Sequence, residues 1–173
     1  MMKLSVTQLT NLIQEQIRRV LIENKLAYYG STQPITKFDL RKTKEFGIHL
    51  GLENPNSSLH RIETSGGYLY HVLVTHTKPL HLPDVLRWTL EAVLRELRWS
   101  SDQIREQKLQ ASKNAKYHGT SLREEENVLL GNILDNLGYD SVVYENKGEA
   151  GGDAVIVWHP EQIQVIKQEK VLP

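Results

Sequence analysis

The sequence predicts an α+β fold with a mainly antiparallel sheet system. Short strand-like segments separated by turns come first, amphipathic helices follow, and two strand-like segments come late in the chain. Strands and helices grouped in this way favour an α+β architecture, whereas strict alternation would favour a parallel sheet. At 173 residues and without repeats, the chain is most simply one domain, residues 1–173, able to bury roughly 70% of its unfolded surface.

Composition narrows the classes of function. The chain has no cysteine, which excludes disulfides and thiolate catalysis and fits a reducing compartment, so we expect a cytoplasmic protein. Lys+Arg and Asp+Glu both number 21, and this balance argues against nucleic acid as a partner. No segment approaches the ~20 apolar residues that span a bilayer, so no membrane partner is expected. The seven histidines show no HxxxH or HExxH spacing, so no metal site is predicted.

The first expected element is an amphipathic helix over about residues 6–24. Ser5 and Gln8 form a capping box at its start. The apolar positions that recur at helical spacing are Leu9, Leu12, Ile13, Ile17, Val20 and Leu21. Strands follow over residues 26–30, 47–51 and 68–74, the last after the turn signal of Gly66 and Gly67.

A helical insertion is expected over about residues 83–116, between the early and the late strands. Pro83 and Asp84 predict the start of its first helix, with Trp88 in the core. Ser101 is expected to start a second helix that fades in the polar stretch 110–116.

The last part of the chain carries the clearest local signals. Ser121 and Glu124 form a capping box for a helix over about 122–137, and Gly138 is its natural stop. Strands are expected over residues 138–144 and 154–163, joined by a glycine-rich, charged loop. Polar loops between well-formed strands often carry function.

These two late strands read GYDSVVY and AVIVWHPEQI, and they resemble the C-terminal strands of the ADP-ribosyltransferase-like fold, especially of its bacteriophage polyvalent-protein type. The resemblance covers about residues 26–166. It implies two small antiparallel sheets that form a split β-sandwich with flanking helices. It also implies NAD as substrate, bound without a Rossmann fingerprint because no GxGxxG spacing is present.

The early strand YYGS resembles the family's YHGT segment. Tyr29 stands at the place of the histidine that holds the ribose. Gly30 keeps the glycine whose backbone binds the nicotinamide amide, and Ser31 follows it among the expected NAD contacts. A glycine suits this place because the ligand must approach the backbone closely.

The segment GIHLG with the residues after it is similar to the family's second strand and helix start. His49 falls on the tyrosine of the family's triad. Ser57 falls on a small pocket residue, and His60 on the aromatic residue that stacks against nicotinamide.

The family's catalytic glutamate normally precedes the last of these strands, where this chain has Ala154. The resemblance therefore leaves Asp153 and Glu149, in the glycine-rich loop, as the candidate carboxylates. Cleavage of the bond between ribose and nicotinamide passes through an oxocarbenium-like state, which a fixed carboxylate stabilises. Losing one preorganised group of this kind commonly costs ~10²–10³ in rate.

Each of these residues also has a purely structural interpretation. Tyr29 is a common strand former, and His49 alternates with its apolar neighbours, as on the solvent side of an edge strand. Asp153 and Glu149 fit solvated loop charges. Residues 117–120 copy YHGT literally, but they lie just before a helix cap, where the fold expects no first strand.

The leading functional hypothesis is an NAD-dependent ADP-ribosyltransferase that modifies a macromolecular acceptor, expected to be a protein. The resemblance implies a phage-derived or anti-defence role. The alternative hypothesis is a catalytically inactive binding module that acts through protein–protein interaction, which Ala154 and Tyr29 favour. A third is an α+β interaction domain without NAD.

Overall fold

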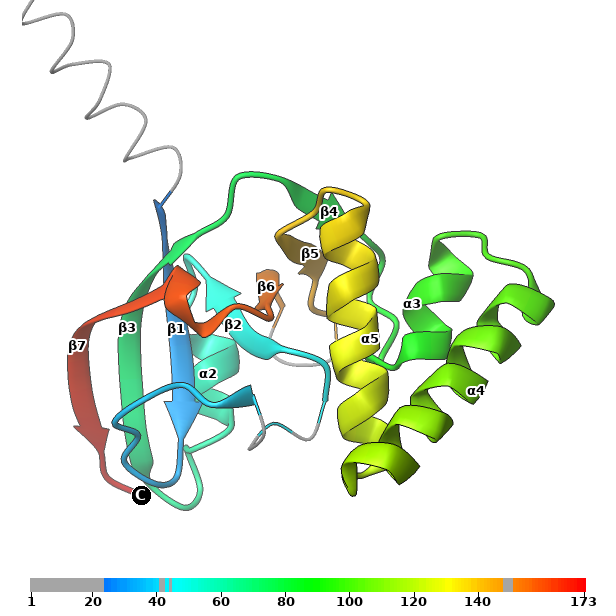
Figure 1. Cartoon of the computed structure of the whole chain (residues 1–173). Helices are drawn as coiled ribbons and strands as arrows, with labels where there is room; N and C mark the ends of the chain where they lie inside the picture. Colours follow the sequence, from blue (N-terminus) through cyan, green and yellow to red (C-terminus); the bar gives the residue numbers. More distant parts are fainter. Residues whose placement is uncertain (1–23, 41–42, 44, 148–150) are drawn as a thin grey trace, which may run out of the picture.

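The computed structural model describes residues 24–40, 43, 45–147 and 151–173, and these residues form the α+β fold shown in Figure 1. The strands are β1 (Asn24–Ser31), β2 (Ile48–Leu52), β3 (Gly67–Thr75), β4 (Pro79–His81), β5 (Ser141–Glu145), β6 (Asp153–Val157) and β7 (Ile163–Val171). The helices are α2 (Asn56–His60), α3 (Leu90–Glu96), α4 (Ser101–His118), α5 (Leu122–Asn136) and the 3₁₀ helix η2 (Pro160–Gln162). The predicted α+β class is confirmed. The helix expected near the N-terminus falls on residues 1–23, outside the described residues.

The strands form one seven-stranded sheet in the order β4-β5-β6-β2-β1-β3-β7. Its two halves are joined weakly, because the paired residues of β1 and β2 are only Ala27↔Leu52 and Tyr28↔Gly51 within these two described strands. On one side of this junction β1, β3 and β7 form a long antiparallel ribbon, and on the other lie β2 and β4–β6 (Figure 1). The predicted pair of small sheets is thus a single sheet with a short junction. The period-2 pattern of a strand indicates its faces and not its neighbours, so the sequence could not reveal this link.

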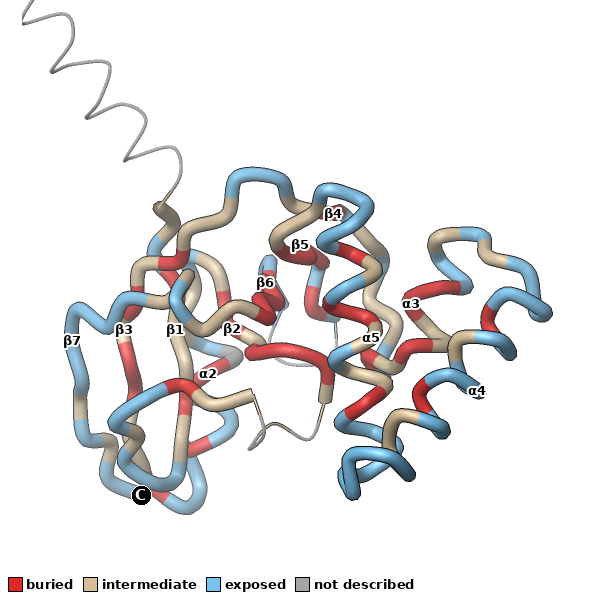
Figure 2. The backbone as a smooth tube through the Cα atoms, viewed as in Figure 1, coloured by how far each residue is buried: buried red, intermediate tan, exposed pale blue. Residues whose placement is uncertain are grey.

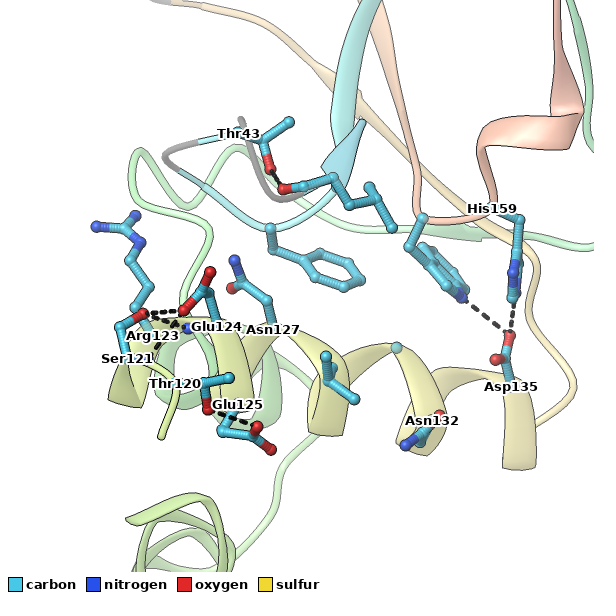
Figure 3. A pocket seen from close by; sticks show the side chains of 16 residues that line it. Thr43, Thr120, Ser121, Arg123, Glu124, Glu125, Asn127, Asn132, Asp135 and His159 are labelled. Atoms are coloured by element: carbon cyan, nitrogen blue, oxygen red, sulfur yellow. Dashed lines mark hydrogen bonds and ion pairs between the residues drawn. The ribbon is translucent and has the colours of Figure 1, made fainter. Parts of the chain in front are cut away.

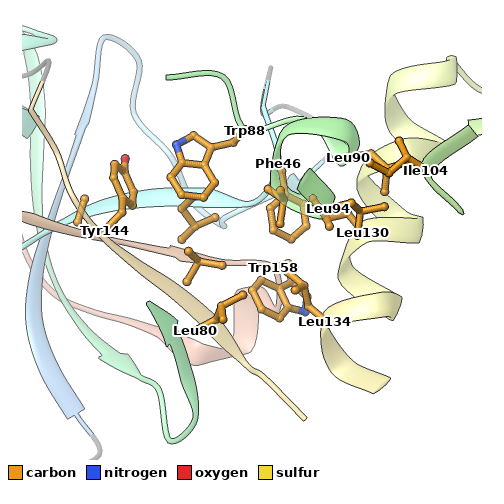
Figure 4. Packing of buried hydrophobic residues seen from close by; sticks show 14 residues of the cluster. Phe46, Leu80, Trp88, Leu90, Leu94, Ile104, Leu130, Leu134, Tyr144 and Trp158 are labelled. Atoms are coloured by element: carbon orange, nitrogen blue, oxygen red, sulfur yellow. The ribbon is translucent and has the colours of Figure 1, made fainter. Parts of the chain in front are cut away.

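The two faces of the sheet carry separate apolar clusters. The helix-covered face packs against α3, α5 and the segment before α3, and its cluster includes Trp88, Leu94, Leu130, Tyr144 and Trp158 (Figure 4). The loop-covered face packs against the segment after β1, and its cluster includes Ala27, Phe38, Leu50, Tyr70 and Val155. Alternation of side chains along each strand assigns successive residues to opposite faces. Figure 2 shows the resulting buried centre and the exposed outer sides of α4 and β7.

The helical insertion begins later than predicted. Helix α3 starts after Thr89, whose side chain accepts a hydrogen bond from the Ala92 amide. The predicted start at Pro83 is wrong, because Asp84 instead accepts a hydrogen bond from the Leu86 amide in a local turn, and Leu86 has a φ of 61°. The short strand β4, which pairs in parallel with β5, was not predicted. Trp88 is in the core as predicted.

Helix α4 does not fade in residues 110–116 but continues for 18 residues, to His118. It begins with a capping box that Ser100 makes with Gln103, and it ends at Gly119, which adopts the left-handed conformation. Its polar sequence reflects its exposure, because only one side of the helix meets the core (Figure 2). A missing apolar stripe therefore does not end a helix that is well capped at both ends.

The last elements are partly as predicted. Helix α5 begins at the capping box of Ser121 and Glu124, and strands β5 and β6 follow it in the expected order. The second predicted strand is shorter, since β6 ends at Val157 and η2 follows. Strand β7, which pairs with β3 at the edge of the sheet, was not predicted. Among the helices of the described residues, none is both long and apolar enough to cross a membrane.

Candidate active site

The junction between the two half-sheets opens at Tyr29. The Glu53 amide donates to the Leu26 carbonyl (3.1 Å), and the β1–β2 pairing continues as far as Tyr28. From Tyr29 to Ser31, β1 keeps its β3 partners but pairs with no residue of the described strand β2. The two strands therefore diverge, and within the described part of the chain one backbone edge of β1 at Gly30 has no strand partner.

Helix α2 packs directly onto this part of β1. A Cβ atom at Gly30 would lie 2.0 Å from the Ser58 carbonyl oxygen, which is too close for any residue with a side chain. The Ser58 hydroxyl donates to the Tyr28 carbonyl (2.8 Å) and fixes the helix to the strand. Gly30 is required here because it lets the α2 backbone approach β1. Ser57 belongs to the same short helix.

His49 lies on the β2 side of the opening and faces the helix-covered side of the sheet. Its Nε2 is 3.0 Å from the Phe46 carbonyl oxygen, and its Nδ1 is 3.2 Å from the Tyr144 hydroxyl. Because a carbonyl oxygen can only accept, Nε2 carries a hydrogen, and a neutral His49 ring accepts from Tyr144 at Nδ1. The ring also makes an edge contact with Trp88, and its side chain is 11% exposed. His49 is therefore held in one orientation.

Glu45 brings a carboxylate to His49 from the segment before β2. Its Oε2 atom is 4.0 Å from His49 Nε2, and its side chain is 43% exposed. Gly47 lies midway between the two residues and has a φ of +70°. This left-handed conformation turns the chain so that the Glu45 side chain approaches His49. Sequence reasoning missed this pair, although a positive-φ glycine between an acid and a histidine is a local signal for such a turn.

Gly30 and His49 share one face of the sheet, whereas Tyr29 lies on the other. Tyr28 is opposite Gly51, so the next residues on the same face are Gly30 along β1 and His49 along β2. The Tyr29 ring packs on the loop-covered face against Phe38, with ring centroids 5.2 Å apart. The structure thus brings Gly30, His49 and α2 together, but not the Tyr29 side chain.

The remaining expected NAD contacts are at the surface. The Ser31 hydroxyl donates to the Gln33 carbonyl (2.7 Å) in the turn after β1. The His60 side chain is 67% exposed, and its Nδ1 is 3.8 Å from a carboxylate oxygen of Glu63.

Of the two expected carboxylates, the one that the structure describes, Asp153, does not lie on the His49 face. Ala154 is in register with both Gly51 and Tyr144, so the place of the family's glutamate is on this face. Asp153 precedes it, is exposed, and belongs by alternation to the opposite face. Glu149 lies outside the described residues.

A pocket of about 530 Å³ lies on the same side of the sheet, beyond the start of β2 (Figure 3). Its lining combines the segment before β2 with α5 and with Trp158 and His159 after β6. One end is fixed by Asp135, whose Oδ1 accepts from Trp158 Nε1 (2.9 Å) and lies 3.0 Å from His159 Nε2. Of the described residues that the resemblance selects as NAD contacts or carboxylates, none lines this pocket. Phe46 connects the two places, because its ring lines the pocket and its carbonyl oxygen contacts His49.

The literal YHGT copy forms the junction between α4 and α5. His118 and Thr120 both contact the Glu125 carboxylate, at 2.9 Å and 2.7 Å. These hydrogen bonds, His118 first, hold the pKa of Glu125 below its ordinary value. The motif therefore ties two helices together, and Thr120 and Glu125 line one end of the pocket.

Comparison with known proteins gives one family and two solved structures. The family described as "ADP-Ribosyltransferase in polyvalent proteins" matches residues 23–171. The structure of the M. tuberculosis MbcT–MbcA toxin–antitoxin complex matches at 13% identity and a TM-score of 0.40, over 89% of this chain and 90% of that one. The structure of an anti-CRISPR protein matches at 18% identity and a TM-score of 0.37, over 85% of this chain and 95% of that one. No curated protein matches.

Proposed function

Because the chain belongs to the family of ADP-ribosyltransferases in polyvalent proteins, we propose that it transfers ADP-ribose from NAD to a macromolecular acceptor. The acceptor is a protein, and the setting is the cytoplasm of a bacterial host. An anti-defence role of a phage-derived protein follows from the same resemblance.

The reaction breaks the bond between C1′ of the nicotinamide ribose and the ring nitrogen of nicotinamide. The electron pair of that bond leaves with nicotinamide, which becomes neutral. An acceptor atom then forms the new bond to C1′ and releases its proton. The protein has to hold the nicotinamide, exclude water and stabilise the positive charge that develops on the ribose.

The divergence of β1 from β2 beside His49 is the observation that supports the proposed position of the NAD site. An edge of backbone at Gly30 can pair with the carboxamide of nicotinamide, as a strand pairs with its neighbour. The His49 ring, held by Phe46 and Tyr144, offers a fixed imidazole on the facing strand. Preorganised groups of this kind bind without losing side-chain entropy.

The other expected residues have secondary places in this proposal. Ser31, Ser57 and His60 are proposed contacts of the ribose and nicotinamide at the mouth of the opening. Tyr29 contributes through its backbone, because its ring packs against Phe38 on the opposite face. Asp153, the first residue of β6, and Glu149 in the segment before it stay candidate carboxylates.

A second candidate function is a catalytically inactive module that recognises a protein partner. One observation favours it: Ala154, 3% exposed, occupies the place of the family's catalytic glutamate. In this alternative the opening at Gly30 is a remnant of the family fold, and NAD is neither bound nor cleaved.

Nicotinamide release distinguishes the two candidates. The purified protein is incubated with NAD alone and with a bacterial lysate, and His49→Ala is run beside it. We expect release by the native protein, increased by lysate, and strongly reduced release by the variant. Absence of release together with absence of NAD binding in calorimetry would support the inactive module. Thermal unfolding of each protein checks that the variant is folded.

A further inference from the structure

The proposed site has no carboxylate at the position where the resemblance expects one. Ala154 is buried between Gly51 and Tyr144 and has no ionisable group. Asp153 faces the other side of the sheet by alternation. An oxocarbenium-like state without a nearby anion would be poorly stabilised. Among the described residues, a carboxylate for this site therefore has to come from another element.

Glu45 places a carboxylate on the correct face. Its Oε2 atom is 4.0 Å from His49 Nε2, while Tyr144 contacts the other ring nitrogen at 3.2 Å. The histidine therefore lies between the phenol on one side and the carboxylate on the other. The Glu45 side chain is 43% exposed, so it can contact a ligand as well as the imidazole.

The backbone of Glu45 is fixed, although its side chain is partly exposed. The carbonyl oxygen accepts from the Thr43 hydroxyl (3.0 Å) and from Asn127 Nδ2 on α5 (3.4 Å). The next residue, Phe46, donates its amide to the Trp88 carbonyl (3.4 Å). A Cβ atom at Gly47 would lie 2.5 Å from an Ile156 methyl carbon and 2.8 Å from the Val157 carbonyl oxygen. The turn is thus packed against β6 and holds the Glu45 backbone at a defined place.

We propose that Glu45 is the catalytic carboxylate of this protein, in place of the glutamate that Ala154 replaces; this inference rests on the function proposed above. If the β1–β2 ladder continued, Gly30 would stand opposite His49, because Tyr28 stands opposite Gly51. A ligand in the opening between these two residues touches the His49 ring. The Glu45 carboxylate beside that ring then faces the ribose attached to the ligand.

Glu45 has two roles in this arrangement. Its negative charge stabilises the positive charge that develops on the ribose when the bond to nicotinamide breaks. It then accepts the proton that the acceptor releases as the new bond to C1′ forms, so that charge and protons balance. Its side chain is 43% exposed, which lets the proton exchange with solvent after each turnover.

The test compares Glu45→Gln with the native protein and with Glu161→Gln. The control removes an equivalent charge, since a Glu161 carboxylate oxygen lies 3.7 Å from His159 Nδ1 at the surface. Nicotinamide release gives kcat and KM, calorimetry gives NAD affinity, and circular dichroism gives the melting temperature. Glu45→Asp tests whether a shorter carboxylate restores part of the rate.

We expect Glu45→Gln to lower kcat by about 10²–10³-fold, with little change in NAD affinity or melting temperature, and Glu45→Asp to recover part of it. Glu161→Gln should keep the native rate. Native kcat in a folded Glu45→Gln protein overturns the assignment while the proposed function stands. Asp153→Asn is assayed as a further variant, and a loss of rate confined to it would assign the carboxylate to the start of β6 instead. If the native protein releases no nicotinamide with lysate, the proposed function and this inference both fail.

Discussion

Replacing Gly30 with alanine is expected to displace α2 and destabilise the protein. The new Cβ atom would lie 2.0 Å from the Ser58 carbonyl oxygen, and real contacts of this kind are essentially never shorter than 3.0 Å. Helix and strand must therefore separate by about 1 Å. The neighbouring atom is backbone, so no side-chain rotation can relieve the overlap.

The magnitude follows from two contributions. Overpacking of this kind typically costs about 1–3 kcal/mol, and weakening the hydrogen bond from Ser58 to the Tyr28 carbonyl adds about 0.5–1.5 kcal/mol. We expect a loss of about 1.5–4.5 kcal/mol in the free energy of unfolding, or about 3–18 °C in melting temperature for a chain of this size. Urea unfolding followed by circular dichroism measures it.

Two variants separate these contributions. Ser58→Ala removes the hydrogen bond without the overlap and should cost no more than the second contribution alone. Gly119→Ala adds a methyl group where no atom lies within 4 Å, at a φ of +69°, and should cost only about 1–2 kcal/mol for the left-handed backbone. A Gly30→Ala protein within about 0.5 kcal/mol of the native protein would refute the packing argument.

Three further predictions concern α5 and the pocket. Hydrogen bonds from His118 and Thr120 lower the pKa of Glu125 from its ordinary value of 4.5. The ionised carboxylate therefore stabilises the fold at pH values above 4.5, and this contribution is lost as the pH falls through the lowered pKa. Glu125→Gln should for this reason flatten the acid limb of a plot of melting temperature against pH. Ser121→Ala should cost about 0.5–2 kcal/mol in urea unfolding, because the capping box of α5 is lost. Val128→Glu, at a half-exposed pocket position, should leave NAD affinity unchanged in calorimetry, whereas a loss of binding would move the NAD site to the pocket.

The elements that the sequence predicted well are those with strong local signals. Helix α5 has a capping box at Ser121 and a glycine after its end, so residues next to each end predict where the helix starts and stops. Strands β1, β2, β3, β5 and β6 are short apolar runs bounded by turns. Trp88 is buried as expected, because a large aromatic residue is highly buried on average.

The elements that it missed depend on distant partners. Strand β7 is largely exposed at the sheet edge, and its sequence IQVIKQEKV lacks a regular apolar face. It is a strand because β3 offers a free edge, which no local pattern indicates. Pro83 and Asp84 are equally good signals for a turn and for a helix start, and the structure has the turn, in which the Leu86 amide donates to Asp84.

The candidate site shows the same division. The resemblance selected Gly30 and His49, and the strand register places both on one face. It also selected Tyr29, whose ring lies on the opposite face, because adjacent residues of a strand cannot share a face. Glu45 was missed because it lies outside the segments that resemble the family, and only the turn at Gly47 brings it to His49. Single-domain organisation stays a prediction.

The place where NAD binds is tested most directly by nuclear magnetic resonance on the isotopically labelled native protein. If NAD binds where β1 and β2 diverge, it shifts the backbone amide signals of Gly30, Ser58 and His49, together with the imidazole signals of His49. Little change is expected at Val128 and Asn132, which line the pocket on α5. Shifts confined to those two residues, or the absence of any shift at saturating NAD, would contradict the claim that NAD binds where β1 and β2 diverge.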